Sequence, residues 1–383
     1  MINFACRYFR GSKPCVFNKQ HGSECPSCRH VSRYAERVLF IKLDAIGDVL
    51  RSASLLPAII ARHQAPFIAW LTRKESVELV GMMRDVDEVI ELSDDGFARV
   101  VSGAWDHVYS PSNDLTSASI ASAAATRGDP IGFYMRDGVL TPSNEAAATW
   151  LEMAAFDRLK RENTQSYQHR MLAILGAPEG TPVPPPAIRV DDGLRGAAAA
   201  RLAELCGGGT RRRVAVNIGS GGRWPKKMLY ADQIYHYARR LRERVDVDVL
   251  LVGGSAELEK AATITAMRQP GDRIATALTE TSVPEFVATL MEVDALLCGD
   301  TLALHVAAGI GLPTVAVFGP INAAEIFPFG GLIAKTWTRQ LDCLVYYGDC
   351  RKQDNCMSLL DLTELVDLTV AQLQPAPARR SVR

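Results

Sequence analysis

The sequence has no long apolar run, no excess of charge and no internal repeat, and each absence excludes a class of protein. No hydrophobic stretch approaches the roughly 20 residues that a helix needs to cross a membrane. The 43 basic and 43 acidic residues cancel, so no nucleic-acid partner and at most peripheral membrane association are expected. The first thirty residues hold no apolar core of a secretory signal, and no repeat of solenoid length is visible. These features predict a cytoplasmic protein.

The length of 383 residues exceeds what one hydrophobic core usually holds, so it favours two domains. From Val38 onward, apolar runs, turns and amphipathic stretches alternate, which is typical of βαβ units. The pattern stops at 176–190, where five prolines disfavour helix interiors and central strands, and it restarts afterwards. We expect an α/β fold of two facing Rossmann-like, doubly wound domains with a cleft between them, divided into a cysteine-rich segment at 1–37, domains at 38–180 and 187–375, and a tail at 376–383.

The pattern also places individual elements. Buried strands are predicted where apolar residues run together, namely at VLFIKL, PFIAWLT, DEVIEL, DHVYSP, RVAVNIG, DVDVLLVGG, RIATAL, DALLCGD and PTVAVFGP. Apolar residues at 49, 50, 55, 56, 59 and 60 predict one helix that begins near Asp48. Further helices are expected over MLYADQIYHYARRLRERV, SAELEKAATITAMRQ, VPEFVATLMEV and LTELVDLTVAQLQP. The sheet should be parallel, with helices on both faces.

The turn from Asp44 to Asp48 joins a predicted buried strand to a predicted helix. Turns at the carboxyl ends of parallel strands line the ligand crevice of such folds. Asp48 has two interpretations: it caps the helix, or it projects into the crevice as a general base that takes a proton from an acceptor hydroxyl. We expect Asp44 to be a solvated loop residue.

A glycine-rich turn, NIGSGGRWPKK at 217–227, follows the first strand of the second domain. Small residues such as Gly219 let the backbone approach a phosphate closely, and Ser220 offers a hydroxyl. Arg223, Lys226 and Lys227 supply positive charge. A diphosphate fits this chemistry, although basic residues after such a turn are also typical of a solvated face.

Two further turns follow strands of the second domain. Asp300, Thr301, Leu302 and His305 lie at the start of a predicted helix, and unpaired amides at such a start bind anions without a metal. A lone histidine is more often a satisfied core or capping residue than a ligand. Glu257 follows a strand that ends in glycines, and it can accept hydrogen bonds from ribose hydroxyls or cap the next helix.

Four of the nine cysteines crowd the amino-terminal segment. Cys6, Cys15, Cys25 and Cys28 supply enough thiolates for a tetrahedral structural zinc site, or an iron site. Free or redox-active thiols are the alternative reading. Because four thiolates would leave no open coordination position, we expect no catalytic metal.

The remaining five cysteines are scattered along the second half of the chain. Cys343, Cys350 and Cys356 have no fourth ligand within their own segment, so packing or free thiols are favoured over a metal. Cys206 and Cys298 are expected to be small buried residues.

Two motifs resemble those of glycosyltransferase family 9, the ADP-heptose:lipopolysaccharide heptosyltransferases. These are KLDAIGDV at 42–49 and DTLALHVAA at 300–308, the latter followed by FGP at 318–320. The resemblance implies a GT-B fold, an ADP-sugar donor, inversion at the anomeric carbon and no obligatory metal. An oligomer is compatible with it.

The resemblance also implies roles for individual residues. Asp48 matches the proposed catalytic base of the family. The basic phosphate-binding region corresponds to the stretch with Arg223 and Lys226, the ribose-binding carboxylate to Glu257, and the diphosphate-binding loop to the stretch that holds Thr301, Leu302 and His305.

Three departures from the family pattern leave the acceptor open. Asp44 stands where a small residue is common, and Ala303 where glycine is more usual. The cysteine-rich segment is an addition to the lipopolysaccharide enzymes. The acceptor is therefore a glycan, a protein or a small molecule. Alternative functions are a nucleotide-sugar epimerase of the same architecture, or a sugar-nucleotide-binding scaffold without catalysis.

Overall fold

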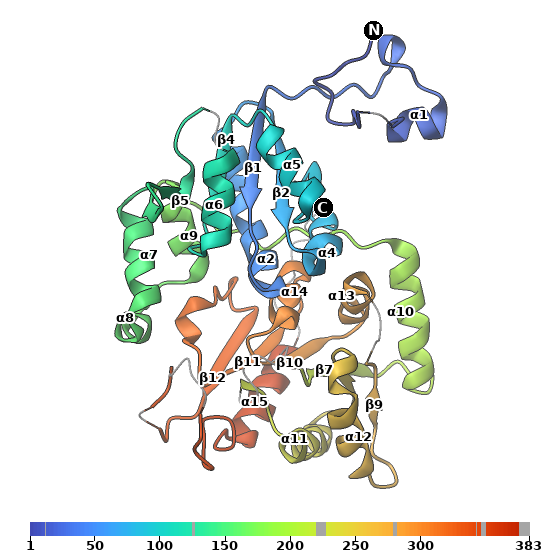
Figure 1. Cartoon of the computed structure of the whole chain (residues 1–383). Helices are drawn as coiled ribbons and strands as arrows, with labels where there is room; N and C mark the ends of the chain where they lie inside the picture. The colour runs from blue at the N-terminus through green and yellow to red at the C-terminus, as the bar shows by residue number, and fades with distance from the viewer. Residues whose placement is uncertain are drawn as a thin grey trace. The chain divides into compact units, whose positions relative to one another are not determined.

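The buried apolar runs form the strands of two separate sheets (Figure 1). The structure is a computed structural model, and it describes residues 1–11, 13–124, 127–219, 227–278, 282–341, 343–345 and 350–374. Among these residues, no helix combines the length and the apolar character needed to cross a bilayer.

The first sheet has six strands in the order β3-β2-β1-β4-β5-β6. All neighbours pair in parallel except β5 and β6, which form an antiparallel hairpin at one edge. The strands are β1 (Glu36–Ile41), β2 (Pro66–Thr72), β3 (Glu88–Glu91), β4 (His107–Ser110), β5 (Ile131–Arg136) and β6 (Val139–Pro142).

Helices α5 and α6 supply one layer against this sheet. Their apolar side chains, which include Val100, Ile120 and Ala121, pack on buried residues of β1, β2 and β4 such as Leu39 and Ala69. The helices in this part of the chain are α2 (Ile46–Ser52), α3 (Leu56–Ile60), α4 (Val77–Gly81), α5 (Asp94–Ser102), α6 (Leu115–Ala124), α7 (Glu145–Ala155), α8 (Asp157–Glu162) and α9 (Tyr167–Ile174).

The second sheet also has six strands, in the order β12-β11-β10-β7-β8-β9, and all of them run parallel. The strands are β7 (Arg212–Asn217), β8 (Val247–Val252), β9 (Ile274–Thr276), β10 (Ala295–Cys298), β11 (Thr314–Phe318) and β12 (Ile333–Trp337). The central positions of the four inner strands, β10, β11, β7 and β8, are buried, as expected for parallel strands that are covered on both faces.

Helices α11, α12 and α15 pack on one side of the second sheet, where Tyr237, Ile264 and Leu365 join the core. Helices α10, α13 and α14 form a second packed group. The elements are α10 (Asp192–Leu205), α11 (Ala231–Arg244), α12 (Leu258–Ala266), α13 (Val283–Met291), α14 (Leu302–Ile310) and α15 (Leu362–Leu373).

The two sheets share one topology. When the strands of each sheet are counted in chain order, both read 3-2-1-4-5-6 from edge to edge. In a doubly wound fold of this order, ligands bind where the strand order reverses, beyond the carboxyl ends of strands 1 and 4. The positions to inspect are thus the ends of β1 and β4 in the first sheet, and of β7 and β10 in the second.

The chain packs as two compact units that are not continuous in sequence. Unit 1 comprises 1–45, 54–151 and 169–183, and unit 2 comprises 46–53, 152–168 and 184–383. Helix α2 and the segment around α8 therefore belong to unit 2, although the chain on either side of them belongs to unit 1.

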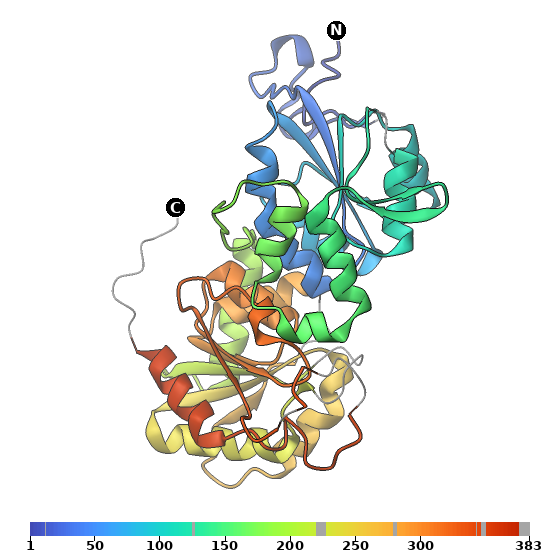
Figure 2. The same cartoon turned by 90° about the vertical axis from the view of Figure 1, so that its left-hand side faces the viewer.

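The amino-terminal segment lies at the end of the first sheet where its strands begin (Figures 1 and 2). It contains the short helix α1 (Val16–His21). The guanidinium of Arg7 forms an ion pair of 2.7 Å with Asp87, just before β3. The ring of Tyr34 packs against that of Phe67 in β2, with centroids 5.0 Å apart. Within unit 1 the segment is thus placed at the amino ends of the strands.

Two predictions about local structure were wrong. The helix expected to begin near Asp48 does begin there, at Ile46, but it is not continuous: it is broken at Ala53–Leu55 before it resumes as α3. Pro57 in the first turn of α3 explains the break, because proline has no amide hydrogen to donate to a continuous helix.

The first sheet was expected to be parallel throughout, but it has one antiparallel edge strand. Asp137 and Gly138, both with positive φ, form the two-residue turn between β5 and β6. This dipeptide is a strong hairpin signal, but the prediction of a parallel sheet rested on helix and strand periodicity, which does not include turn residues.

Candidate functional site

Helix α2 packs against helix α14 within unit 2, and this contact brings the two sequence motifs together. Gly47 permits the close approach. A Cβ atom at Gly47 would lie 3.0 Å from Cδ2 of His305 and 3.6 Å from the backbone nitrogen of Leu302. Asp48, the next residue, is thereby positioned beside the first turn of α14.

Asp48 is the third residue of α2, so it is not the residue that caps this helix. Its carboxylate forms an ion pair with Arg51 one turn later, with Oδ1 and the guanidinium nitrogen 2.6 Å apart. The side chain of Asp48 is 34% exposed, whereas that of Arg51 is 12% exposed. The ion pair orients the carboxylate and still leaves it accessible to a substrate.

Arg51 is held in place by an aromatic ring as well as by Asp48. Its guanidinium carbon lies 3.7 Å from the centroid of the Tyr167 ring, a cation–π contact. The hydroxyl groups of Tyr167 and Ser52 are 2.9 Å apart. Burial by itself would lower the pKa of Arg51, but the charges of Asp48, Tyr167 and Asp300 raise it above its usual range. The guanidinium is therefore a permanent positive charge in this site.

Asp300 follows strand β10 and faces several cationic groups. Its Oδ1 lies 3.6 Å from Nε2 of His305, and Lys227 donates a hydrogen bond of 2.7 Å to its backbone carbonyl. Burial alone would raise the pKa of Asp300, but His305, Lys227 and Arg51 lower it to about 2. Asp300 is thus an ionised carboxylate that helps to hold positive charge beside the start of α14.

The amino-terminal end of α14 is formed by Thr301, whose side chain makes no capping hydrogen bond among the described residues. Its hydroxyl oxygen instead accepts a hydrogen bond of 3.1 Å from the side-chain amide, Nδ2, of Asn217. The same amide donates to the carbonyl oxygen of Gly219 at 2.9 Å. Asn217 therefore links the ends of β7 and β10, the two strands at the switch point of the second sheet.

Glu257 lies beside Gly219. A Cβ atom at Gly219 would fall 2.5 Å from the carboxyl carbon of Glu257, so glycine is needed there for this arrangement. The carboxylate accepts a hydrogen bond of 2.9 Å from the amide of Gly254. The local capping bond considered for this residue is therefore present, and the half-buried carboxylate remains next to the glycine-rich turn.

Lys260 adds an amine close to this carboxylate. Its Nζ donates to the backbone carbonyls of Ile218, at 3.2 Å, and Leu229, at 2.6 Å. Burial lowers the pKa of Lys260 to about 8, against the opposing effect of Glu257. This lysine ties the start of the glycine-rich turn to the segment that follows it.

Three of the expected donor-binding residues, Ser220, Arg223 and Lys226, lie outside the described residues. The described residues at the two ends of their segment, Gly219 and Lys227, both contribute to the arrangement at the ends of β7 and β10.

The expectation that Asp44 is a solvated loop residue was wrong. Its carboxylate forms an ion pair of 2.9 Å with Lys42 and accepts a hydrogen bond from the hydroxyl of Ser112. Lys42 also donates to this hydroxyl at 2.9 Å. The lysine side chain is only 3% exposed, and a buried ammonium group needs a counter-charge. Asp44 supplies it.

The four amino-terminal thiols are free and half-buried. Of the residues that the structure describes, only Glu36, His63 and His107 bring three potential ligand atoms together, so Cys6, Cys15, Cys25 and Cys28 are not arranged as a formed metal site.

The remaining five cysteines lie in the second half of the chain. Cys206 and Cys298 are buried, as predicted. Cys343 accepts a hydrogen bond from Lys352, with a distance of 3.1 Å. Burial raises the pKa of the Cys356 thiol, and the nearby Cys350 adds to the effect.

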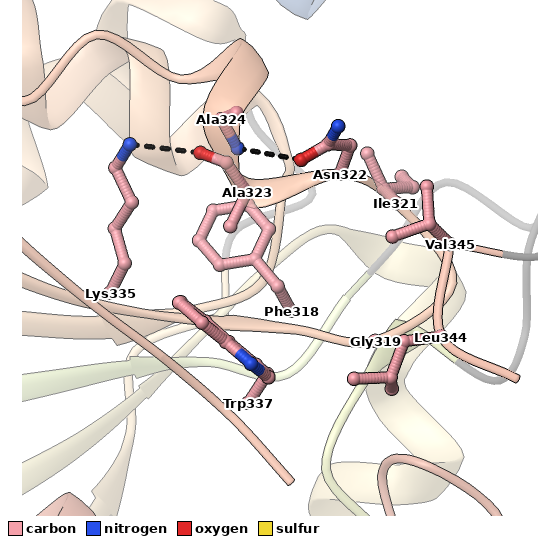
Figure 3. A pocket seen from close by; sticks show the side chains of 10 residues that line it. All are labelled: Phe318, Gly319, Ile321, Asn322, Ala323, Ala324, Lys335, Trp337, Leu344 and Val345. Carbon is pink, nitrogen blue, oxygen red and sulfur yellow. Dashed lines mark hydrogen bonds between the residues drawn. The ribbon is translucent and has the colours of Figure 1, made fainter. Parts of the chain in front are cut away.

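A cavity of about 380 Å³ opens at the carboxyl ends of β11 and β12 (Figure 3). Phe318 and Trp337, the last residues of these strands, line it together with Ile321, Leu344 and Val345. The lining is mainly apolar, with the amide of Asn322 and the amine of Lys335 at its border. The amine of Lys335 donates to backbone carbonyls, including that of Ala323 at 2.8 Å, and burial lowers its pKa.

Sequence reasoning missed Arg51 and Tyr167, and it gave Asn217, the first residue of the glycine-rich turn, no role of its own. Arg51 had a readable signal, because it lies three residues after Asp48 on the same helical face. Asn217 ends a predicted strand at a switch point, which is also a signal. Tyr167 has none, since only the packing of unit 2 brings it to helix α2.

Several solved structures are similar to this chain. The chain is similar to the E. coli ADP-heptose lipopolysaccharide heptosyltransferase II, with a TM-score of 0.66 and 18% identity over 88% of this chain and 98% of that one. It is similar to the E. coli heptosyltransferase WaaC solved with ADP, with a TM-score of 0.58 and 15% identity over 88% and 99%.

A third similar structure is the iron-containing dodecameric glycosyltransferase TibC from enterotoxigenic E. coli. Its TM-score is 0.51, with 10% identity over 88% of this chain and 76% of that one. No curated protein matches the sequence. At these identities, the likeness shows the GT-B fold.

The sequence itself shows the family. The model of glycosyltransferase family 9 (heptosyltransferase) matches residues 99–350. This range contains β7 and β10, the two strands at the switch point of the second sheet. Together with the α/β fold of two Rossmann-like units, this match shows that the chain belongs to glycosyltransferase family 9 and is a glycosyltransferase.

Proposed function

We propose that this glycosyltransferase transfers a heptose, or a related sugar, from an ADP-sugar to an acceptor hydroxyl with inversion of the anomeric centre. The observation that carries the proposal is the contact between α2 and α14. It positions an accessible carboxylate, Asp48, next to a helix start that lacks a side-chain cap among the described residues.

In the proposed reaction, Asp48 accepts the proton of the acceptor hydroxyl while the oxygen of that hydroxyl bonds to the anomeric carbon. The bond between that carbon and the diphosphate oxygen breaks, and its electron pair leaves with ADP. Amide groups at the start of α14 then stabilise the negative diphosphate, assisted by Lys227 and by the charge of Arg51. No metal is required for any of these steps.

The donor assignment draws on site chemistry and on the similar structures. A helix amino terminus beside Lys227, with Gly219 and Glu257 next to it, suits a diphosphate linked to a ribose. Ser220, Arg223 and Lys226 would add to the phosphate contacts. Heptosyltransferase WaaC has been solved with ADP and with ADP-2-deoxy-2-fluoro heptose. We infer the same class of donor for this chain.

The acceptor is proposed only as a hydroxyl of a glycan, a protein or a small molecule. The cytoplasm is the proposed location. TibC is dodecameric, and we propose that this chain also forms an oligomer.

Structural zinc, or iron, on Cys6, Cys15, Cys25 and Cys28 stays a hypothesis. It is supported by four thiols in one short segment and by the iron content of TibC. In the arrangement described above the four sulfur atoms are not gathered around one point, so the hypothesis requires the segment to close around the ion.

The test of the proposed function is the variant Asp48→Asn, which keeps the size of the side chain and removes the base. We expect turnover to fall about 10²- to 10⁴-fold, the usual contribution of a general base. Affinity for ADP, measured by calorimetry, should stay unchanged, because the diphosphate contacts do not involve Asp48. Turnover is followed as ADP release from ADP-heptose, with saccharides and serine peptides as acceptors and with water alone.

The matched control is Asp85→Asn, an exposed aspartate elsewhere in the chain. It should transfer sugar like the unmodified protein. A folded Asp48→Asn variant with full turnover would show that Asp48 is not the base. Conversion of the donor without any acceptor, into an isomeric sugar nucleotide, would favour an epimerase instead.

A further inference from the structure

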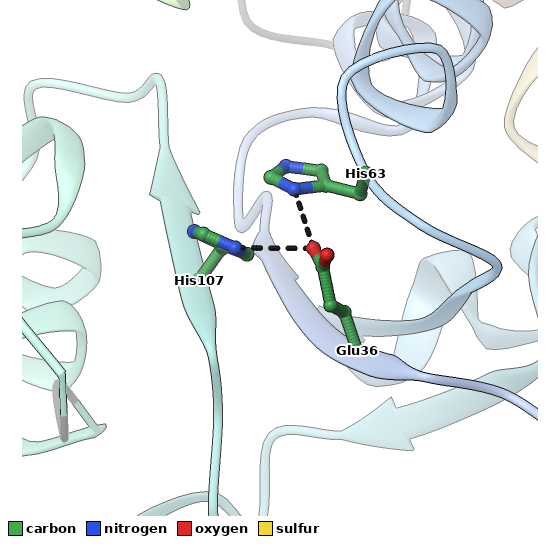
Figure 4. A group of neighbouring side chains, drawn as sticks. All are labelled: Glu36, His63 and His107. Carbon is green, nitrogen blue, oxygen red and sulfur yellow. Dashed lines mark ion pairs between the residues drawn. The ribbon is translucent and has the colours of Figure 1, made fainter.

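Three side chains that can bind a metal converge in unit 1, far along the strands from the turn that carries Asp44. Glu36 is the first residue of β1, His107 is the first residue of β4, and His63 follows helix α3. One ligand atom from each lies within 4.8 Å of the other two. Figure 4 shows the two imidazole rings directed at the carboxylate.

The strand pairing explains part of this convergence. Val38 of β1 pairs with His107 of β4 in parallel register. Since side chains alternate along a strand, Glu36, His107 and Tyr109 project from one face of the sheet. Glu36 Oε2 lies 2.8 Å from Nδ1 of His63 and 3.2 Å from Nε2 of His107.

Neighbouring groups orient both His63 and Glu36. The Nε2 atom of His63 lies 2.8 Å from the hydroxyl of Tyr109, a fully buried residue. If Nε2 donates to this hydroxyl, Nδ1 keeps its lone pair for a metal, as in most histidine ligands. The other carboxylate oxygen, Oε1 of Glu36, accepts a hydrogen bond of 3.1 Å from the amide of Gln64. This bond turns Oε2 toward the two rings.

The cluster is incomplete as a hydrogen-bonded ion pair. Glu36 Oε2 is buried and has no hydrogen bond of acceptable geometry from any described residue, although two ring nitrogens are close. The guanidinium of Arg62, the residue before His63, is directed to the carbonyl of Leu175.

We propose that Glu36, His63 and His107 form a binding site for a divalent first-row transition metal such as Zn²⁺. Two imidazoles and one carboxylate are a ligand set that zinc and its neighbours accept, with water in the remaining positions. The His107 side chain is 37% exposed, so the ion can exchange with solvent.

The position of the site indicates a structural role. It joins β1, β4 and the turn after α3 at the amino ends of the strands, the same end of the sheet at which the amino-terminal segment packs. The ion therefore cross-links three chain segments that are distant in sequence. It takes no part in the proposed transfer reaction, and its test needs no measurement of activity.

The experiment uses the full-length chain with Cys6, Cys15, Cys25 and Cys28 changed to serine, which removes the amino-terminal thiols as competitors. Co²⁺ is the probe, because its absorption spectrum distinguishes thiolate ligands from nitrogen and oxygen ligands. We expect one equivalent to bind with visible d–d bands and without a thiolate charge-transfer band. Zn²⁺ should displace it and raise the melting temperature, since it binds only the folded state.

Two variants in this background identify the ligands. Glu36→Gln and His107→Ala should each weaken Co²⁺ binding at least about 100-fold, the upper end of the loss seen when an outer-shell partner is removed. Tyr109→Phe should weaken it about 10-fold through ring orientation alone. His236→Ala, at an exposed position of α11, is the matched control and should bind as before.

The outcomes decide the proposal. Lack of saturable binding, a thiolate spectrum, or equal affinity in Glu36→Gln and the unmodified ligand set would each overturn it. If His107→Ala fails to fold, Glu36→Gln and Tyr109→Phe still carry the test, because both nearly keep the size of the side chain. The parent chain with its cysteines intact then tests the amino-terminal hypothesis separately: a second, thiolate-bound equivalent supports it, and one equivalent contradicts it.

Discussion

The two switch points of this glycosyltransferase have the same topology, but they differ at the start of the helix that follows strand 4. One of these helices is capped by a side chain and the other is not. In unit 1 this helix is α6, and the carboxylate of Asp114 accepts a hydrogen bond of 2.9 Å from the amide of Ser117 in its first turn. In unit 2 it is α14, where Thr301 makes no such bond among the described residues. A bound carboxylate already occupies the anion position of α6, whereas that of α14 is left for a ligand.

The charged groups near the two switch points also differ in how completely they pair with one another. In unit 1, Lys42, Asp44 and Ser112 satisfy one another after β1 and β4. In unit 2, Asp300 is held by a long contact of 3.6 Å to His305 and by positive charge from other elements. Strand order therefore marks two equivalent places in the two sheets, and in the proposed function the local side chains decide which of them receives the diphosphate.

The largest expected effect comes from making α14 resemble α6. In Thr301→Asp, a carboxylate would cap the helix and occupy the position proposed for the diphosphate. Like charges placed together cost several kcal/mol, so the affinity for ADP should fall at least about 100-fold. Calorimetric titration with ADP measures this, and Thr301→Ser serves as the control that keeps the hydroxyl.

The melting temperature of Thr301→Asp should stay equal or rise, because aspartate is a good capping residue. Loss of ADP binding together with unfolding would therefore not support the comparison. Unchanged affinity in a folded Thr301→Asp variant would show that the diphosphate does not bind at this helix start.

A medium effect is expected from the pH dependence of Asp300. Its folded-state pKa of about 2 lies below the unfolded value, so its ionised form stabilises the fold above about pH 4. This stabilisation is lost as the pH falls from about 4 through 2. Asp300→Asn should therefore lower the free energy of unfolding at pH 7 by roughly 2 kcal/mol, and this difference should shrink toward pH 2.

Urea denaturation at a series of pH values measures that difference. The exposed Asp85→Asn variant provides the baseline for a neutralised aspartate. A gap between the unmodified chain and Asp300→Asn that does not change between pH 5 and pH 2.5 would contradict the charge arrangement described for this residue.

The smallest effect is expected in unit 1. Asp114→Ala removes the cap of α6 and should destabilise the fold by about 1 kcal/mol, the typical value for such a cap. Because the anion position of α6 is not used for the donor, ADP affinity should be unaffected. Thermal unfolding and ADP titration of the same sample check both statements, and a large loss of ADP affinity would reverse the assignment of the two switch points.

Much of the fold was readable because it depends on local patterns. The nine apolar runs predicted as strands all form strands, and the restart of the pattern after the proline-rich stretch reflects the second sheet. The β5–β6 hairpin and the break before α3 also had local signals, in Asp137-Gly138 and in Pro57. Neither feature follows from the helix and strand periods, because both depend on the chemistry of a turn.

The candidate site was readable only in part. Asp48, Thr301 and His305 follow strands in recognisable motifs, but their proximity depends on the packing of α2 against α14. Tyr167 had no signal, because its contact with Arg51 joins segments that only unit 2 brings together. Asp44 was misjudged, since a buried partner such as Lys42 cannot be recognised from the order of residues alone.

By itself, the sequence determined which segments become strands and helices, and which turns follow the carboxyl ends of strands. Both depend on side-chain periodicity and on glycine and proline within a few residues. The tertiary structure decided which of those turns meet. The 3-2-1-4-5-6 order makes β1 adjacent to β4 and β7 adjacent to β10, although other strands separate them in the chain. Glu36 and His107 meet for that reason, and so do Asn217 and Thr301.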